Sequence, residues 1–224
     1  MGPRKTTTRE RLITTAAELF RRQGYAQTGV NQIIQEANAT SGSFYHFFPA
    51  KEDLLLAVVD HIADIFDREI FSPPADRSDD PIGEVFDILD LYRRQLNDGG
   101  FTFGSPMASL SAEVSENHPQ VRARLADVFG AWTERIEVLL RRAGSHLPQN
   151  IDHTALAQLI VCTMEGAVLG TRVNRSLAPF DAVVDQLRTY FELLDSRAGV
   201  PAAVPAHRRS SSDAQPPAAD WRSW

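Results

Sequence analysis

Residues 7–51 read TTRERLITTAAELFRRQGYAQTGVNQIIQEANATSGSFYHFFPAK, and this stretch decides the fold of the N-terminal part of the chain. Its first third carries one apolar stripe at helical spacing, formed by Leu12, Ile13, Ala16, Ala17, Leu19 and Phe20. Thr7 and Glu10 have the spacing of a capping box, so we expect the first helix to begin there. Gly24 follows the last apolar residues and can adopt the left-handed conformation that ends a helix.

Two shorter helices are predicted after Gly24. Thr28 suits an N-cap, and the apolar positions that follow share one helical face: Val30, Ile33, Ile34 and Ala37. Asn38 stands where this helix must stop, because Asn tolerates the left-handed backbone better than most residues. Thr40 can then cap a third helix over residues 41–48, which Pro49 ends.

Two short helices joined by a tight turn match the helix-turn-helix pattern, in which the later helix reads DNA. The third helix carries side chains that are small or polar-tipped: Thr40, Ser41, Gly42, Ser43, Tyr45 and His46. Hydroxyl groups and an imidazole can bond phosphate oxygens and base edges, and Gly42 lets a backbone approach closely. The same segment contains three phenylalanines, of which we expect at least two to pack inward: Phe44, Phe47 and Phe48.

The run GYAQTGVNQIIQEANATSGSFYHFFPAKEDLL resembles the DNA-binding domain of the TetR family of bacterial transcriptional regulators. The resemblance covers about residues 7–60 and implies that the phosphate backbone or base edges are contacted by Thr28, Thr40, Ser43, Tyr45, His46 and Lys51. The sequence departs from the family pattern at three positions. Asn38 stands where Gly is usual, Ser41 where Lys or Arg is frequent, and Ala50 where a Ser usually caps the next helix.

The net charge of −6 is unexpected for a DNA-binding protein, but the charge is unevenly distributed. Residues 1–51 hold seven basic and three acidic residues, a net of +4, so the remaining 173 residues carry −10. A basic N-terminal domain on an acidic body is the asymmetry expected when only one part meets phosphate. The alternative is that these basic side chains only solvate the first helix.

The composition is that of a cytoplasmic globular protein. The 224 residues are 43% hydrophobic, which is enough for a sizeable core. A single cysteine, Cys162, excludes an internal disulfide and fits a reducing compartment. No apolar run reaches the roughly 18 residues of a membrane span, and the first ten residues lack the apolar core of a signal peptide.

The rest of the chain predicts further helices and no strands. Apolar periodicity places them at residues 51–71, 82–97, 106–116, 119–143, 152–176 and 179–196. We therefore expect an all-α fold of about nine helices, with a helix-turn-helix domain at residues 1–51 and a helical effector-binding and dimerisation domain at 52–198. Residues 199–224, rich in Pro, Ala and Ser, are predicted to be disordered. Trp221 and Trp224 there are either a docking motif or incidental aromatics.

The family resemblance implies an effector pocket among the helices of the body. Candidate lining residues are Phe66, Phe86, Phe103, Met107, Leu110, Trp132 and Met164, with Glu113 or Glu165 as a polar anchor. The aromatic content favours an apolar or aromatic effector. Each of these residues can equally be plain core, and Glu113 can be a solvated surface residue. The helix at 51–71 would transmit ligand binding to the DNA-binding domain.

The last two helices are apolar enough to form a four-helix bundle with a second copy of the chain. Small side chains at Cys162, Gly166 and Gly170 form one ridge that would let a partner helix come close. On the final helix we expect the partner to meet Val184, Leu187 and Phe191. The alternative is that both helices only complete the core of the monomer.

Catalytic and metal-binding patterns are absent from the sequence. The six histidines lack metal-ligand spacing, and Cys162 on an apolar face fits an inert thiol better than a nucleophile. We therefore predict a homodimeric repressor, with no cofactor or metal, that a small molecule releases from a near-palindromic operator. The alternatives are a helical enzyme or carrier with a vestigial N-terminal domain, and an activator or architectural DNA-binding protein. The retention of Tyr45, His46 and Lys51 argues against a vestigial domain.

Overall fold

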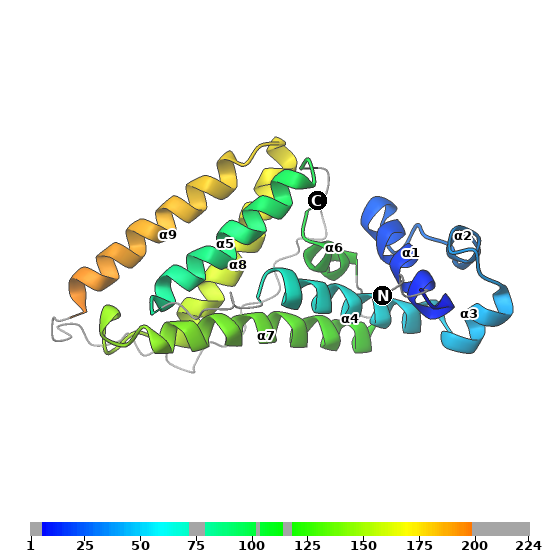
Figure 1. The fold of residues 1–224 in the computed structure, drawn as a ribbon, viewed down its shortest axis with the longest axis horizontal. Coiled ribbons are helices and arrows are strands. Elements are labelled where there is room, and N and C mark those ends of the chain that lie inside the picture. Colours follow the sequence, from blue (N-terminus) through cyan, green and yellow to red (C-terminus); the bar gives the residue numbers. More distant parts are fainter. Residues whose placement is uncertain (1–5, 72–78, 102–103, 114–117, 199–224) are drawn as a thin grey trace, which may run out of the picture.

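The computed structural model describes residues 6–71, 79–101, 104–113 and 118–198. In these ranges the chain is all-helical, which confirms the predicted fold class, and the helices are arranged as shown in Figure 1. They are α1 (Thr8–Gln23), α2 (Val30–Glu36), α3 (Ser41–Phe47), α4 (Lys51–Glu69), α5 (Pro81–Asp98), α6 (Pro106–Glu113), α7 (Pro119–Arg142), a short 3-10 helix (Gly144–His146), α8 (His153–Asn174) and α9 (Ala178–Arg197).

Helix α1 begins and ends where its sequence predicts. The Thr7 hydroxyl accepts a hydrogen bond from the Glu10 N–H at 3.2 Å, and the Glu10 carboxylate accepts one from the Thr7 N–H at 2.7 Å. This reciprocal pair satisfies two of the N–H groups that a helix start leaves without partners. Gly24 ends the helix with φ at +86°, a backbone conformation in the left-handed half of the map that side chains disfavour.

The helix-turn-helix pair differs from the prediction at one cap. Gly29, not Thr28, is the N-cap of α2, because the Thr28 hydroxyl is turned back to donate to the Gly24 carbonyl at 2.7 Å. Asn38 does adopt the left-handed conformation after α2, with φ at +48°. Thr40 caps α3 as expected, accepting a hydrogen bond from the Ser43 N–H at 3.1 Å.

Two of the three phenylalanines of α3 and its C-cap pack inward, as predicted. Phe44 and Phe48 are buried among the apolar residues of α1 and α2, while Phe47 stays exposed. Ala50, at the start of α4, has no side-chain oxygen to act as a cap. Instead, the Asp53 carboxylate accepts from the Ala50 N–H at 2.8 Å, which is half of a capping box.

We call α1–α3 the head and α4–α9 the body. Figure 1 shows the head at one end of the molecule, with α4 and α7 running lengthwise beside each other and α5, α8 and α9 inclined across the other end. The buried apolar residues form one cluster that includes both head and body. Where α4 meets α7, the Phe66 and Trp132 rings stack with their centroids 4.9 Å apart.

Most predicted helix boundaries differ from the observed ones by one or two residues. The predicted disordered tail at 199–224 and most of the loop after α4 lie outside the described residues. The long helices follow the prediction closely because each has an apolar stripe and a proline or acidic residue at its start, as with Pro81 in α5 and Asp152 before α8.

The left-handed backbone at Asn38 yields a stability prediction. Replacing Asn38 by Gly should leave the melting temperature of the protein unchanged or raise it, whereas Asn38→Val should cost about 1–2 kcal/mol, because a branched side chain clashes in this conformation. Thermal unfolding followed by circular dichroism measures both. Asn31→Val, at an exposed position inside α2, is the matched control and should change the stability far less. Equal losses in the two Val variants would contradict the backbone argument.

Candidate nucleic-acid interface and ligand cleft

Helix α3 presents polar and aromatic side chains on its exposed face. Tyr45 is 57% exposed, and His46, Ser41 and Gly42 are also exposed. The Thr40 and Ser43 hydroxyl groups lie 2.8 Å apart, so each orients the other at the start of the helix. Of the residues predicted to contact DNA here, Ser43 is half-buried and the others are exposed, so their hydroxyl and ring groups can reach a nucleic acid.

Gly42 is not required by the fold itself. Its backbone is helical, and a side-chain Cβ placed there would meet no atom closer than the Thr40 hydroxyl at 3.9 Å. Glycine within a helix lowers stability relative to alanine. The absence of a side chain at this position leaves α3 with a bare patch of backbone between Ser41 and Ser43, which a binding partner can approach.

Arg11 supports the turn between α2 and α3. Its guanidinium group donates to the Ala37 carbonyl at 3.1 Å and to the Asn38 carbonyl at 3.4 Å. These carbonyls end α2, so a charged donor from α1 replaces the helical bonds that they lack. The sequence alone does not show this role of Arg11, because Arg11 and the turn are 26 residues apart and no local pattern links them.

Two predicted DNA contacts need correction. Thr28 is only 1% exposed, and its hydroxyl bonds the Gly24 carbonyl, so its side chain is not available to a phosphate. The Lys51 ammonium group donates to the Tyr25 carbonyl at 2.6 Å and lies 4.0 Å from the centre of the Tyr25 ring. Lys51 therefore joins α4 to the turn after α1 in this structure instead of pointing away from the protein.

Tyr25 stands at the centre of a junction between head and body. We define the Tyr25 junction as Tyr25, Lys51, Glu52, Glu113 and His118. The Glu113 carboxylate, at the end of α6, accepts from the Ala26 N–H at 3.0 Å, and His118 Nδ1 lies 3.2 Å from a Glu52 carboxylate oxygen. The His118 and Tyr25 rings meet edge to face, with centroids 5.6 Å apart.

Burial shifts the pKa of two groups of the Tyr25 junction, Lys51 and Tyr25. Burial lowers the pKa of Lys51 and the nearby Glu113 partly opposes this, while burial and Glu52 together raise the pKa of Tyr25. Glu113 was predicted to be a ligand anchor, and this is wrong: its carboxylate contacts the head. A Cβ on Gly24 would lie 2.9 Å from a Glu113 oxygen, so a side chain there would displace the Glu113 carboxylate.

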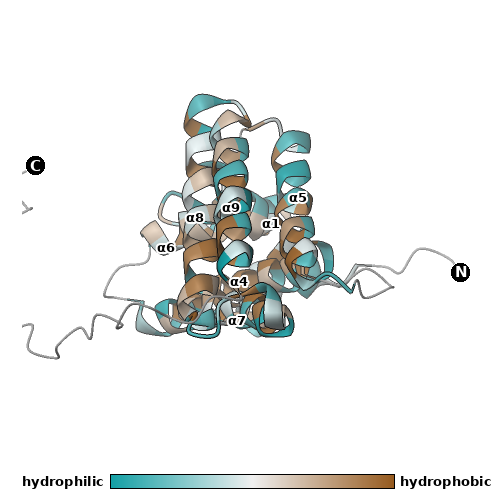
Figure 2. Ribbon diagram, turned by 90° about the vertical axis from the view of Figure 1, so that its left-hand side faces the viewer, coloured by the Kyte–Doolittle hydropathy of each residue, from teal (hydrophilic) through white to brown (hydrophobic). Residues whose placement is uncertain are grey.

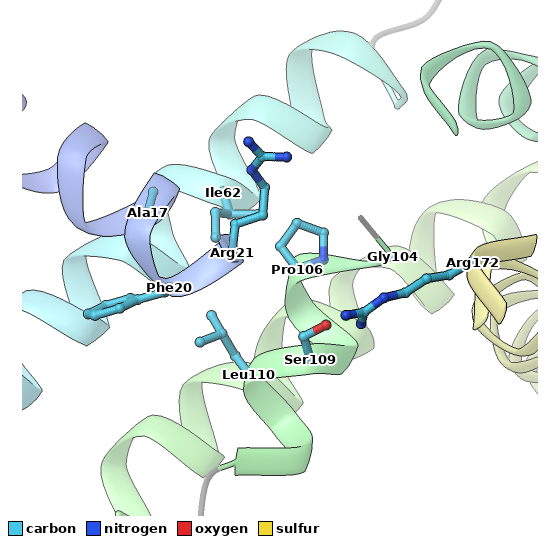
Figure 3. Close-up of a pocket in the computed structure, with 9 residues that line it drawn as sticks. All are labelled: Ala17, Phe20, Arg21, Ile62, Gly104, Pro106, Ser109, Leu110 and Arg172. Carbon is cyan, nitrogen blue, oxygen red and sulfur yellow. The ribbon is translucent and has the colours of Figure 1, made fainter. Parts of the chain in front are cut away.

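A cleft of about 340 Å³ opens between α1, α4, α5 and the start of α6. Its lining is largely apolar and includes Ile62, Ile65, Phe66, Tyr92 and Leu96. A narrower crevice continues from it between α1 and α6 and reaches Arg172 of α8, as Figure 3 shows. A volume of this size lies within the usual range for small-molecule sites.

The predicted effector residues are only partly brought together. Phe66 lines the cleft and Leu110 lines the crevice, whereas Met107, Trp132 and Met164 are buried core residues behind them. Phe86 packs against Phe191 of α9, with ring centroids 5.6 Å apart, and lines a separate groove; its assignment to this pocket is wrong. Phe103 lies outside the described residues.

A buried polar cluster of Tyr92, Ser105 and Glu165 lies behind the cleft. Of these residues, the sequence indicated only Glu165, as one of two possible polar anchors for a ligand. The Tyr92 hydroxyl lies 3.5 Å from Glu165 Oε1, and Ser105 hydrogen bonds with both residues. Glu165 Oε2 is buried without a hydrogen-bond partner among the described residues. Burial raises the pKa of Glu165, and hydrogen bonds from Ser105 and Tyr92 oppose part of the rise. An ionised Glu165 is therefore costly here.

A second exposed surface runs along α8. Apolar or small residues recur there with alternating spacings of three and four, at Leu159, Cys162, Gly166, Leu169 and Val173, and all five are exposed. On α9, which stands beside α8 in Figure 2, Tyr190 and Leu193 are also exposed. Leu169 is 61% and Val173 74% exposed, and apolar side chains at this spacing are typical of helix–helix interfaces.

Four of the six predicted dimer residues point elsewhere. Val184, Leu187 and Phe191 are buried in the core of their own chain, and a Cβ on Gly170 would lie 3.0 Å from Pro179 of the same chain. Cys162 and Gly166 do lie on the exposed face of α8. The sequence does not show which apolar residues of α9 enter the core of their own chain, because more than one face of the helix contains apolar residues and only packing distinguishes them.

By length and composition alone, α8 is long and apolar enough to cross a membrane. This is weak evidence, because the core helices of soluble proteins pass the same test, and here 44% of the apolar window is already buried inside the structure. Within the part of the chain that the structure describes, no group of three or more His, Cys, Asp or Glu residues could hold a metal ion.

Comparison with known proteins identifies both parts of the chain. Residues 12–58 match the family described as bacterial regulatory proteins, tetR family, and residues 81–186 match the C-terminal domain of LmrA/YxaF-like transcriptional regulators. An HTH-type transcriptional regulator of Mycobacterium tuberculosis H37Rv is 33% identical over 186 residues, which cover 80% of this chain and 92% of that one. The regulator LmrA of Bacillus subtilis is 30% identical over 172 residues, covering 76% and 89%.

A solved structure shows the same fold. The crystal structure of a TetR transcriptional regulator from Chloroflexus aurantiacus aligns with a TM-score of 0.73 and 29% sequence identity, over 83% of this chain and 94% of that one. The likeness extends through head and body, so the arrangement of α1–α3 on the helical body is one that solved regulators share.

The buried carboxyl group yields a pH-dependent prediction. Because the folded protein raises the pKa of Glu165, ionised Glu165 lowers the stability at high pH, and this loss fades as the pH falls through the raised pKa. Glu165→Gln should therefore raise the melting temperature by about 2–4 °C at pH 8, for a gain of about 1 kcal/mol. Thermal scans of both proteins between pH 5 and 8 should show the curves converging at the acidic end. A constant difference across this range would exclude the ionisation as its cause.

Proposed function

Since the chain belongs to the TetR family of bacterial transcriptional regulators, we propose that it is a homodimeric repressor that a small molecule releases from a near-palindromic operator. Its family and relatives are transcriptional regulators, so the chain is not an enzyme. The proposal includes action in the cytoplasm, where the DNA is. The observation that carries it is the exposed face of α3, which offers hydroxyl groups, aromatic rings and bare backbone together.

The composition of α3 favours reading DNA at short range. Its exposed face has no Lys, Arg, Asp or Glu, so long-range attraction to phosphate must come from other parts of the basic head. Short side chains such as Ser41 and Ser43 bond only to atoms that come close, and Gly42 permits that approach. Tyr45 and His46 can bond phosphate oxygens beside the groove.

The exposed apolar face of α8 and α9 supports dimer formation. A self-complementary interface of this kind gives twofold symmetry, which matches the symmetry of a palindromic operator. Two α3 helices must then lie about 34–36 Å apart, or at a multiple of that distance, to enter major grooves on one side of the duplex. A dimer that occupies a promoter in this way blocks polymerase, which is the physical basis for proposing repression.

Release requires that a ligand favour a head spacing that does not fit the operator. Coupling of about 1–3 kcal/mol weakens DNA binding by about 5–150-fold, which is enough to release a repressor. The cleft beside α4 is a suitable place for such a ligand, because α4 belongs to the body and packs directly against α1 of the head.

A substitution at Gly42 tests DNA recognition separately from folding. Gly42→Ala should leave the melting temperature unchanged or raise it, because alanine favours the helix, but should weaken specific DNA binding by roughly tenfold or more, because a methyl group would prevent close approach. Titration against duplex DNA from upstream of the protein's own gene, with a random duplex for comparison, measures the binding. Gly130→Ala, at an exposed helical glycine in α7, is the matched control.

Two outcomes of this titration would count against the proposal. Unchanged operator affinity in Gly42→Ala would show that Gly42 does not lie against DNA. Equal weak binding of the unmodified protein to both duplexes would show that it does not recognise the upstream DNA specifically. Transcription in vitro from the bound promoter then shows whether the protein represses or activates, because a repressor lowers the transcript yield when added and an activator raises it.

The proposed dimer can be tested at Leu169. Leu169→Glu should convert the protein to a monomer on size-exclusion chromatography at micromolar concentration, because a charge would be buried without a partner in an apolar interface. Val138→Glu is the matched control, since Val138 on α7 is also exposed, by 52%, but is not on the α8 and α9 surface. A dimer that persists in the Leu169 variant would place the interface elsewhere.

A further inference from the structure

A groove of about 510 Å³ lies between the start of α5 and the last turns of α9. In Figure 1 these two ends lie at the side of the molecule away from the head. At the floor of the groove the Phe86 and Phe191 rings meet edge to face, and the Arg188 guanidinium lies 4.2 Å from the centre of the Phe86 ring. The groove shares no lining residue with the cleft beside α1, so it is a separate surface.

The rim of this groove is acidic. Its lining holds four carboxylates and one guanidinium group, a net charge of −3 when His146 is neutral. Asp80 caps α5 by accepting from the Gly83 N–H at 2.9 Å, and an Asp195 oxygen lies 3.1 Å from His146 Nδ1. The other two carboxylates, of Asp79 and Glu192, have no hydrogen bond or ion pair within the described part of the chain. The rim therefore carries negative charge that a cationic partner can balance.

The segment that follows α9 has the complementary composition. Residues 200–206 read VPAAVPA and residues 207–209 read HRR, so a run of small apolar side chains precedes a histidine and two arginines. These residues lie outside the described part of the chain. We propose that residues 200–209 bind in the groove of the same chain, with the apolar run over the floor and Arg208 and Arg209 against the acidic rim. Apolar burial and opposite charges would hold the segment together.

The connection is long enough for this segment to reach the groove. Phe191, Glu192 and Asp195 stand three to seven residues before Ala198, the C-cap of α9, which is about 5–10 Å along the helix axis. His207 is nine residues beyond Ala198, and nine residues can span up to about 30 Å. The chain can therefore turn back along α9 and place its basic residues at the rim.

Covalent attachment favours the segment of the same chain over other basic partners. A site and a segment joined by a short linker meet at an effective concentration on the order of millimolar. Ion pairs on an exposed rim are individually weak, so a free basic peptide would need a far higher affinity to compete. The same pairs are screened by salt, so we expect the segment to leave the groove at high ionic strength.

Limited digestion of the full-length protein with trypsin tests the docking, because trypsin cleaves after arginine and a bound segment is protected. Intact mass spectrometry measures the initial rates of cleavage after Arg208 and Arg209, relative to cleavage after Arg222, which lies outside the docked segment. This relative rate should rise at least threefold when the acidic rim is neutralised. In 0.5 M NaCl the unmodified protein should be cleaved at the relative rate of the neutralised variant.

The variants neutralise carboxylates without adding a trypsin site. The triple variant carries Asp79→Asn, Glu192→Gln and Asp195→Asn, and keeps Asp80 because it caps α5. Loss of acidic groups from the last turns of α9 should not fray that helix, since negative charge is unfavourable at a helix C-terminus. Glu134→Gln, at an exposed position on α7, is the matched control and should leave the relative rate unchanged.

Three outcomes would overturn the assignment. Equal relative rates in the unmodified protein and the triple variant would show that the rim does not hold the segment. An equally large change in Glu134→Gln would show that the overall charge of the protein, and not the groove, controls the cleavage. Protection that rises with protein concentration, or that is lost in the Leu169→Glu variant, would place the segment of a second copy in the groove instead of that of the same chain.

Discussion

Burial of one apolar stripe on α4 holds the two parts of this molecule together. The stripe runs along the helix from the head into the body and consists of Leu54, Leu55, Val58, Val59, Ile62 and Phe66. Its first turns pack with α1 and its later turns with α7, so the head has no separate core of its own. Since burial of this kind is the main driving force for folding, the orientation of the DNA-binding surface is tied to the packing of the body.

Polar contacts then set the register along this shared core. Asp60 pairs with Arg124 and Asp67 with Arg135, which aligns α4 with α7 over several turns. These pairs are exposed and contribute little stability, so their effect is on alignment. At the head end, the contacts of the Tyr25 junction take their place, and these are exposed or partly buried. The result is a helix that is held on one side and borders an open cleft on the other, where a ligand can act on it.

Helix α8 is apolar on both its inner and its outer face, and each face has a different explanation. The helix is apolar on its inner face because it packs against α7 and α9, and apolar on its outer face because that face is left without a partner in the single chain. A helix that is apolar all round belongs in a core or a membrane. The dimer proposed above would place this outer face of α8 in a core.

The sequence by itself determined the helices and the nature of the head. Periodicity, caps and turn residues such as Thr7, Gly24 and Asn38 act within a few residues, so they are visible in one dimension, and the run around Tyr45 and His46 identified the family. Only the tertiary structure decided which residues meet across the chain. Lys51 and Glu113 were predicted to face DNA and ligand, and both instead contact the turn after α1. Helix α1 forms a wall of the cleft, and α9 turns Val184 and Phe191 inward. Such placements depend on packing between segments far apart in sequence, where several apolar faces compete for one core, and no local pattern records which face is buried.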